Sequence, residues 1–280
     1  MPKSVNIFVL NWNGRDLTLD CLASLAKVTY PKAKVTVIDN GSTDDSVIKI
    51  KEHYPEIDII ELSENIGFAS GNNAGFQSVT NKSDYAIFLN NDTIVDTHFV
   101  EPLIAELESK PNTKQTAPKI YYADKPETIW FAGGKVNLWT GLIRHLGIRK
   151  KDSAFYSKKR TIDYATGCCV CMRTEDFESI GLFDESFPMY SEDVDLSLRF
   201  NQKGGNIVFI PESKVWHKVS ASMGGQFSIE KWKRKQNAKF RLLAKYVNPI
   251  QGIIAFPIAM IIGIIELKLL IFKIVSRKKK

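Results

Sequence analysis

Residues 85–92 read Tyr-Ala-Ile-Phe-Leu-Asn-Asn-Asp, an apolar run followed at once by two amides and a carboxylate. A run of this length and composition is typical of a strand that is buried on both faces of a sheet. The polar side chains then stand where the strand ends. The same arrangement occurs at three earlier places in the chain, and this repetition predicts the fold.

The earlier apolar runs cover residues 5–10, 34–38 and 57–62, and helical patterns follow them over about 17–25, 44–54 and 68–79. A further helix is predicted over 99–107. Strands that alternate with helices predict an α/β fold with a doubly wound, mostly parallel sheet. Beyond it we expect a smaller subregion: irregular chain with antiparallel strands over 112–165, a strand at 168–172, helices at 175–180 and 192–202, and two short strands at 207–210 and 215–217.

Polar residues follow each predicted strand of the first half. They are Asn11 and Asn13, Asp39 and Asn40, Asn65, and Asn90 with Asp92. Ligands of open α/β sheets bind outside the carboxyl ends of the strands, so we expect one site at that edge. Turn chemistry alone also favours Asn and Asp at any one of these places. Signatures of a dinucleotide-binding Rossmann loop, a P-loop and an α/β-hydrolase elbow are absent from the sequence.

Charge is divided unevenly along the 280 residues. Residues 231–280 contain 13 basic side chains and one acid, Glu266, whereas residues 1–230 carry a net charge of −5. This pattern disfavours a uniformly basic nucleic-acid-binding domain and favours a tail that meets an anionic surface. The four cysteines are too few for a disulfide scaffold and lack zinc-site spacing. We therefore expect buried thiols in a reducing, cytoplasmic setting, without a signal peptide.

Residues 181–196 read Gly-Leu-Phe-Asp-Glu-Ser-Phe-Pro-Met-Tyr-Ser-Glu-Asp-Val-Asp-Leu and place five acids beside aromatic residues. A carboxylate in a partly apolar pocket has a raised pKa and serves as a general base. The alternative is that these acids only stabilise the start of a helix. Asp92 likewise suits a hard divalent cation whose other ligands come from substrate phosphates, or a helix-entry turn.

In this order, the motifs at residues 11–13, 37–44, 65–75, 89–92 and 181–196 resemble those of glycosyltransferase family 2. They are most similar to the rhamnosyltransferase-like branch, which builds bacterial surface polysaccharides. The resemblance covers about residues 4–220. It implies a GT-A fold, a dTDP- or UDP-sugar donor, a divalent metal (Mn²⁺ or Mg²⁺) and inverting transfer of a sugar, with rhamnose favoured, to a hydroxyl of a polysaccharide or lipid-linked acceptor.

The nucleotide-sugar-binding residues that the resemblance implies are Asn11, Asp39, Gly67, Gly71, Asn72, Asn90 and Asn91. Asp39 would accept the N3–H of uracil or thymine, and Asn11 would line the base and ribose pocket. The glycine-rich segment would let the backbone approach the donor. Asn90 departs from the pattern, because the family often has an acid facing the ribose there. A neutral amide still hydrogen-bonds ribose but contributes less to cation binding.

The resemblance also implies the catalytic and metal-binding residues. Asp193 matches the family's base, with Glu192 beside it, and Asp92 with His217 would ligate the metal. A lone histidine after a strand is otherwise a structural hydrogen-bonding residue. One displacement with one base predicts inversion at the anomeric carbon. Two alternatives are a nucleotidyltransferase, which would carry a glycine-rich basic loop after the first strand, and a non-catalytic sugar or nucleic-acid binder.

We expect residues 1–225 to form the GT-A domain, with a nucleotide-sugar half (1–110) and an acceptor and catalytic half (111–225). Residues 226–280 are predicted to form a membrane-associating tail. Residues 231–245 carry seven basic and no acidic side chains, and residues 247–265 carry no charge. Pro249, Pro257 and Gly263 are expected to interrupt that stretch. This favours a re-entrant or interfacial segment on the anionic inner face of the cell membrane; a helix packed on the domain is the alternative.

Overall fold

The computed structural model of the chain describes residues 2–219 and 228–278. Its strands are β1 (Val5–Asn11), β2 (Ala33–Asn40), β3 (Asp58–Leu62), β4 (Tyr85–Asn90), β5 (Thr93–Val95), β6 (Thr113–Tyr122), β7 (Lys125–Phe131), β8 (Gly134–Asn137), β9 (Leu142–His145), β10 (Arg160–Ile162), β11 (Cys169–Arg173) and β12 (Asn206–His217). Its helices are α1 (Arg15–Leu25), α2 (Ser46–His53), α3 (Phe68–Ser78), α4 (Val100–Ser109), the 3-10 helix η1 (Ala154–Ser157), α5 (Thr174–Ile180), α6 (Glu192–Gln202), α7 (Ile229–Tyr246) and α8 (Pro249–Lys278).

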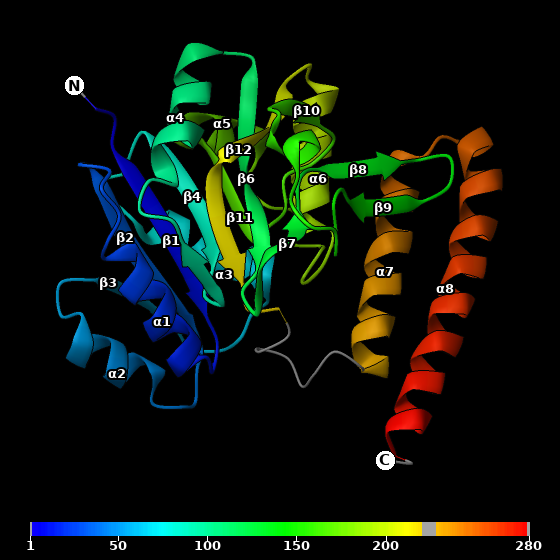
Figure 1. Cartoon of the computed structure of the whole chain (residues 1–280), viewed down its shortest axis with the longest axis horizontal. Coiled ribbons are helices and arrows are strands. Elements are labelled where there is room, and N and C mark those ends of the chain that lie inside the picture. Colours follow the sequence, from blue (N-terminus) through cyan, green and yellow to red (C-terminus); the bar gives the residue numbers. More distant parts are fainter. Residues whose placement is uncertain (1, 220–227, 279–280) are drawn as a thin grey trace.

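The large sheet runs in the order β10-β12-β6-β11-β4-β1-β2-β3. β1 pairs in parallel with β2 and β4, as β2 does with β3 and β6 with β12. β11 is antiparallel to both β4 and β6, so two reversals restore the original direction. The six strands β12, β6, β4, β1, β2 and β3 therefore share one direction, and the doubly wound, mostly parallel α/β sheet is confirmed (Figure 1).

β12 differs from the sequence prediction of two short strands. It is one strand whose pairing with β6 shifts register between Ile210 and Lys214. Pro211 lies in this shift, and proline has no N–H to donate to a sheet ladder. The local break therefore bends the strand without ending it, and His217 still arrives at the carboxyl edge of the sheet.

Helix α3 packs closely on the sheet because two of its residues lack a side chain. A methyl group on Gly75 would lie 2.2 Å from Ile38 Cδ1, and one on Gly71 would lie 3.0 Å from Leu10 Cδ1. A side chain at Gly75 would force Ile38 or the helix to move, and one at Gly71 would crowd Leu10. The glycine-rich segment thus has a packing role that the sequence alone did not reveal.

All four cysteines are free and buried in the core, as predicted: Cys21, Cys168, Cys169 and Cys171. Burial raises the pKa of each thiol, which keeps the thiols protonated. They serve as small apolar residues between the sheet and its helices.

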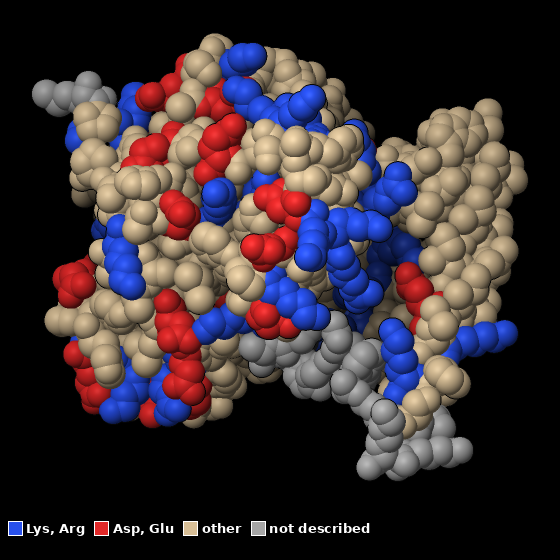
Figure 2. Space-filling model, in the orientation of Figure 1, with Lys and Arg blue, Asp and Glu red and all other residues tan. Residues whose placement is uncertain are grey.

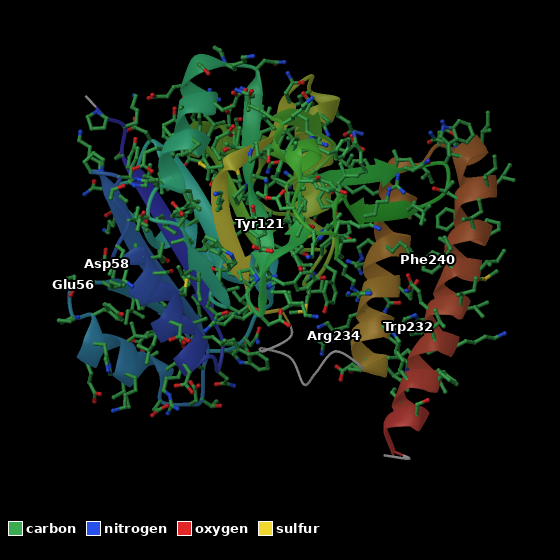
Figure 3. All side chains as sticks on the ribbon, viewed as in Figure 1. Glu56, Asp58, Tyr121, Trp232, Arg234 and Phe240 are labelled. Atoms are coloured by element: carbon green, nitrogen blue, oxygen red, sulfur yellow. The ribbon has the colours of Figure 1, made fainter. Side chains whose placement is uncertain are left out.

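The tail is an antiparallel pair of helices beside the body (Figure 1). α7 contributes Leu242 to the main core, and Leu243 packs against Ala255 and Ala259 of α8. Figure 3 shows Trp232 and Phe240 between the two helices and Arg234 on the side of α7 toward the body. The expected boundary between residues 225 and 226 lies outside the described residues.

The predicted interruption of the hydrophobic stretch is wrong. α8 runs unbroken from Pro249 to Lys278 with Pro257 in its interior. Pro249 occupies the first turn, where no N–H is needed, and Gly263 lies against Gln236 of α7, where it permits close helix contact. By length and composition, Pro249–Ile274 could cross a membrane, with a mean hydropathy of 2.3.

Candidate active site

Asn11 and Asp39 meet at the carboxyl ends of β1 and β2. The parallel register pairs them directly, and both are buried. Asn11 Nδ2 donates to Asp39 Oδ1 (2.7 Å), and the backbone N–H of Ser42 donates to Asp39 Oδ2 (2.9 Å). The structure thus brings together the two residues that the sequence assigned to the nucleoside. Their contact with a base stays a prediction.

Asn91 joins this cluster from the end of β4. Its Nδ2 donates to Asn11 Oδ1 (3.2 Å) and to Thr18 Oγ1 (3.0 Å). Gly14 leaves room for it, because a methyl group there would lie 2.5 Å from Asn91 Nδ2. Sequence reasoning missed Thr18 and Gly14, although both lie within one helical turn after the Asn11 motif.

The other predicted donor residues are placed differently. Asn90 is partly exposed at this edge, and its side chain makes no hydrogen bond within residues 2–219 and 228–278. Gly67 has a φ of 92°, and a methyl group there would lie 2.8 Å from Pro188 O. Asn72 Nδ2 donates to Phe68 O (2.9 Å) inside α3. Gly67, Gly71 and Asn72 thus contact other parts of the protein. Their contact with a donor stays a prediction.

Asp92 and His217 face each other across the ends of β4 and β12. Asp92 Oδ1 lies 3.1 Å from His217 Nε2, and the pairing of β5 with β12 sets His217 opposite Thr93. Asp92 Oδ1 and His217 Nδ1 are buried without a hydrogen-bond partner. A carboxylate with an unsatisfied oxygen beside an imidazole suits a divalent cation. Within the part of the chain that the structure describes, no third His, Cys, Asp or Glu joins them.

Asp193 lies at the start of α6 and reaches solvent. The backbone N–H groups of Gly167 and Val194 donate to Asp193 Oδ2 and Oδ1, both at 2.8 Å. Burial outweighs these bonds and raises the pKa of Asp193. Tyr190 and Ser191, just before the helix, have φ of 69° and 67°, in the left-handed region that costs free energy for residues other than glycine.

Glu192 differs from its neighbour because it is buried and its Oε2 has no hydrogen-bond partner. Burial, together with the charge of Asp193, raises the pKa of Glu192 well above its usual value. The pair therefore divides into an accessible carboxylate with a raised pKa and a buried acid that favours its protonated form. Asp193 is the member of the pair that keeps contact with solvent.

The loop before β11 connects this carboxylate to the strand ends. Cys168 O accepts the backbone N–H of Asn90 (2.9 Å), while the adjacent Gly167 binds Asp193. Asp193 is therefore held beside the end of β4, where Asp92 also lies. One edge of the sheet thus carries the amide cluster, the Asp92–His217 pair and Asp193.

An aromatic wall extends the site toward the second half of the chain. The Trp130 ring lies 4.5 Å from those of His217 and His145, centroid to centroid. Burial lowers the pKa of His145 to about 4. Sequence reasoning treated residues 112–165 as irregular and missed both residues. The apolar run at 129–132, which ends β7, was the available signal.

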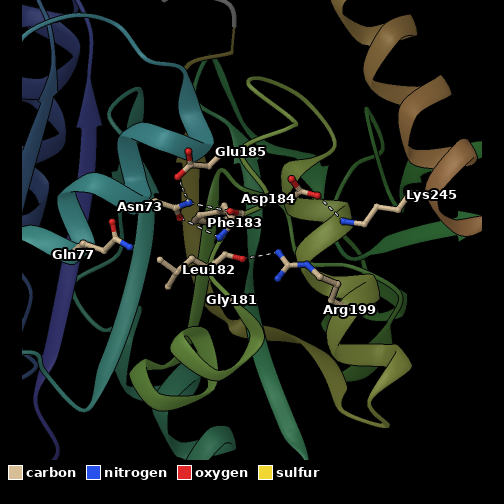
Figure 4. A pocket seen from close by; sticks show the side chains of 9 residues that line it. All are labelled: Asn73, Gln77, Gly181, Leu182, Phe183, Asp184, Glu185, Arg199 and Lys245. Atoms are coloured by element: carbon tan, nitrogen blue, oxygen red, sulfur yellow. Dashed lines mark hydrogen bonds and ion pairs between the residues drawn. The ribbon is translucent and has the colours of Figure 1, made fainter.

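α7 is anchored to α6, the helix that begins with Glu192 and Asp193. Buried Asp195 accepts hydrogen bonds from Lys245 Nζ (2.6 Å) and the Tyr246 hydroxyl (2.7 Å). Lys245 also lines an open pocket of about 450 Å³, where it bonds Asp184 and where Arg199 donates to two backbone carbonyls (Figure 4). Both cations are already bonded to groups of the protein, so these contacts hold α7 against α6 and the loop before it.

Known proteins are similar to this chain in sequence and in fold. The sequence profile described as "Glycosyl transferase family 2" matches residues 6–181. An O-antigen biosynthesis protein of Myxococcus xanthus is 28% identical over 208 residues, which are 71% of this chain and only 16% of that protein. The N-acetylglucosaminyl-diphospho-decaprenol L-rhamnosyltransferase of Mycobacterium tuberculosis is 25% identical over 228 residues, with 72% of each chain covered. Among solved structures, GalNAc-T7 with UDP, GalNAc and Mn²⁺ has a TM-score of 0.68 at 19% identity, over 86% of this chain and 48% of that one.

Proposed function

The chain belongs to glycosyl transferase family 2, and we propose that it is an inverting, metal-dependent enzyme that transfers a sugar, with rhamnose favoured, from a dTDP- or UDP-sugar. The acceptor is a hydroxyl of a glycan or of a lipid-linked sugar in cell-surface polysaccharide synthesis. One observation carries the proposal: Gly167 and Cys168, adjacent in the chain, bond Asp193 and the end of β4. The base therefore lies beside the Asp92–His217 pair.

The chemistry follows from these positions. Asp193 takes the proton from the attacking hydroxyl, and its raised pKa suits a general base. The N–H groups of Gly167 and Val194 hold the carboxylate in place as that proton arrives. Asp92 and His217 would hold Mn²⁺ or Mg²⁺, and a bound cation would neutralise the charge of the leaving diphosphate. A single displacement from the face opposite the leaving group inverts the anomeric carbon.

The comparisons support the finer assignments to different degrees. The name of the mycobacterial relative supports rhamnose as the sugar and a lipid diphosphate as the acceptor's carrier. UDP and Mn²⁺ in the GalNAc-T7 structure support a nucleoside diphosphate donor and a divalent cation. The nucleotidyltransferase alternative loses support, because the loop after β1 carries amides that bond Asp39 and Ser42 rather than a basic, glycine-rich loop.

The tail supports a location of the enzyme at the inner face of the cell membrane. In this proposal residues 1–225 form the GT-A domain, and residues 226–280 form the membrane-associating tail. α8 exposes large apolar side chains along its length: Ile250, Ile253, Ile254, Met260, Ile261, Ile264, Ile265, Leu269, Ile271 and Phe272. A surface of this kind needs a lipid or protein cover. At about 1.5 Å per residue, Pro249–Ile274 extends about 39 Å, enough for the roughly 30 Å apolar layer of a bilayer. Basic side chains gather beside it (Figure 2).

Transfer from nucleotide sugars in the presence of Mn²⁺ tests the proposed function. We expect an inverted linkage by NMR, with a prenyl-diphospho-N-acetylglucosamine as the acceptor. Asp92→Asn should raise the Mn²⁺ concentration for half-maximal transfer by about tenfold or more, because one ligand is lost. Asp58→Asn, an exposed carboxylate on the edge strand β3 (Figure 3), is the matched control. Failure of the wild-type protein to use any nucleotide sugar would refute the proposal.

A further inference from the structure

The basic side chains along α7 differ in whether they have bonded partners in the body of the protein. Near the carboxyl end of α7, Lys245 Nζ bonds Asp184 and Asp195, both at 2.6 Å, and Arg241 donates to Ser186 O. In the amino-terminal half of α7, Lys235 makes no hydrogen bond or ion pair with any residue of 2–219 or 228–278, and the same holds for Lys239 in the middle of the helix. The body thus pairs the basic residues at the carboxyl end of α7, whereas Lys235 and Lys239 have no such partner among the described residues.

Lys235 lies beside Tyr190, three residues before the candidate base Asp193. Its Nζ is 5.3 Å from the centre of the Tyr190 ring, and Tyr190 leads through Ser191 into the start of α6. Lys235 keeps much of its solvent exposure. Partial desolvation by the surrounding protein lowers its pKa, and the charge of Lys231 lowers it further. The acid of the tail that opposes this shift, Glu266, accepts a hydrogen bond from Gln236 Nε2 (2.8 Å).

Lys239 stands one helical turn after Lys235, so the two ammonium groups share a face. Helical spacing puts that face between the side of α7 that meets the body, at Leu242, and the side that meets α8, at Leu243. The turn between β8 and β9 contacts both tail helices: a methyl group on Gly141 would lie 3.0 Å from Leu243 Cδ1 and 3.3 Å from Ala259 Cβ. Figure 2 shows basic side chains in the hollow between the body and α8.

We propose that Lys235 and Lys239 form the subsite for the phosphate or diphosphate that joins the acceptor sugar to its lipid. This rests on the proposed function. A lipid-linked sugar carries a reactive hydroxyl, then an anionic link, then an apolar chain. The protein presents Asp193 at the start of α6, then Lys235 beside Tyr190 with Lys239 one turn further along α7, then the exposed apolar side of α8. The matching order selects an amphipathic, anionic acceptor over a neutral glycan.

Lys235→Met keeps the aliphatic stem and removes the charge. We expect the KM for a prenyl-diphospho-N-acetylglucosamine to rise about 10- to 100-fold, because a charged hydrogen bond is lost, while kcat and the donor KM stay unchanged. An alkyl N-acetylglucosaminide, which lacks the diphosphate, should be used equally by wild type and variant. Lys235→Arg should restore most of the affinity. Lys233→Met, an exposed lysine of the same helix, is the matched control.

The other source of the same anionic chemistry is a phospholipid headgroup. Flotation of each variant with phosphatidylcholine vesicles, with and without phosphatidylglycerol, separates the two sources. A change in vesicle binding for Lys235→Met without a change in acceptor KM would overturn the subsite. An equal rise in KM for the uncharged glycoside would do so as well, since it would show a general structural effect. Transfer to neutral acceptors only would contradict the lipid-diphosphate acceptor and leave the glycosyltransferase activity standing.

Discussion

Asp193→Asn removes the proposed base and leaves the volume of the side chain unchanged. The carboxylate accepts one backbone N–H on each oxygen, from Gly167 and Val194. An amide has one accepting oxygen, so one N–H loses its partner, at a cost of about 1–3 kcal/mol of stability. Removal of a partly buried charge offsets part of that cost. We therefore expect a folded variant whose turnover falls by about 10²–10⁴-fold, which corresponds to about 2.7–5.4 kcal/mol in the activation barrier.

Single-turnover transfer from a labelled nucleotide sugar, together with calorimetric titration of the donor, checks this expectation. The donor dissociation constant should change by no more than about threefold, because Asp193 makes no hydrogen bond with the described Asn11–Asp39 cluster. The raised pKa of Asp193 also places the acid limb of the kcat/KM profile above the ordinary aspartate range near 3.9, and the limb should vanish in the variant. Turnover within tenfold of wild type, or an equal loss of donor affinity, would show that Asp193 is not the base.

Two further outcomes follow from the site and the tail. The native pKa of Glu192 is raised above its usual value of 4.5, so the native state holds that proton more tightly than the unfolded chain does. The free energy of unfolding should therefore fall as the pH rises above about 4.5 toward the native pKa. Glu192→Gln should remove that part of the decline in urea unfolding at a series of pH values, and an unchanged slope would contradict the burial argument. The full chain should pellet with membranes and stay there during a wash in about 1 M salt. At that concentration the screening length is roughly 3 Å, so the attraction of the α7 basic residues to an anionic membrane is lost, whereas the apolar contacts of α8 remain. Release by salt alone would show that the attachment depends on charge only.

Local sequence was sufficient for the sheet and for much of the site. An apolar run of five or six residues followed by Asn or Asp marks where a strand stops, and parallel strands bring such ends to one edge. This reasoning correctly brought Asn11 and Asp39 together and placed Asp92 on the same edge. The buried cysteines followed from composition in the same way. Each of these features depends on residues that are close in sequence or on a regular repeat.

Features that depend on distant partners were decided only by the tertiary structure. Trp130 reaches His217 across 87 positions of chain, and no periodicity within 112–165 announces that contact. Gly71 belongs to the segment predicted to let the backbone approach the donor, and the structure adds that it lies against Leu10, where its helix packs on the sheet. Pro257 predicts a break that the structure does not have, since α8 continues through it.

The division of roles between Glu192 and Asp193 shows the physical reason. Adjacent acids at the start of a helix look alike in sequence, but 100° of helical rotation turns Glu192 into the core and leaves Asp193 only partly buried. Their pKa values then depend on what the rest of the chain packs around them. Sequence determined that two carboxylates stand at the start of α6, and the fold decided which of them is buried and which keeps contact with solvent.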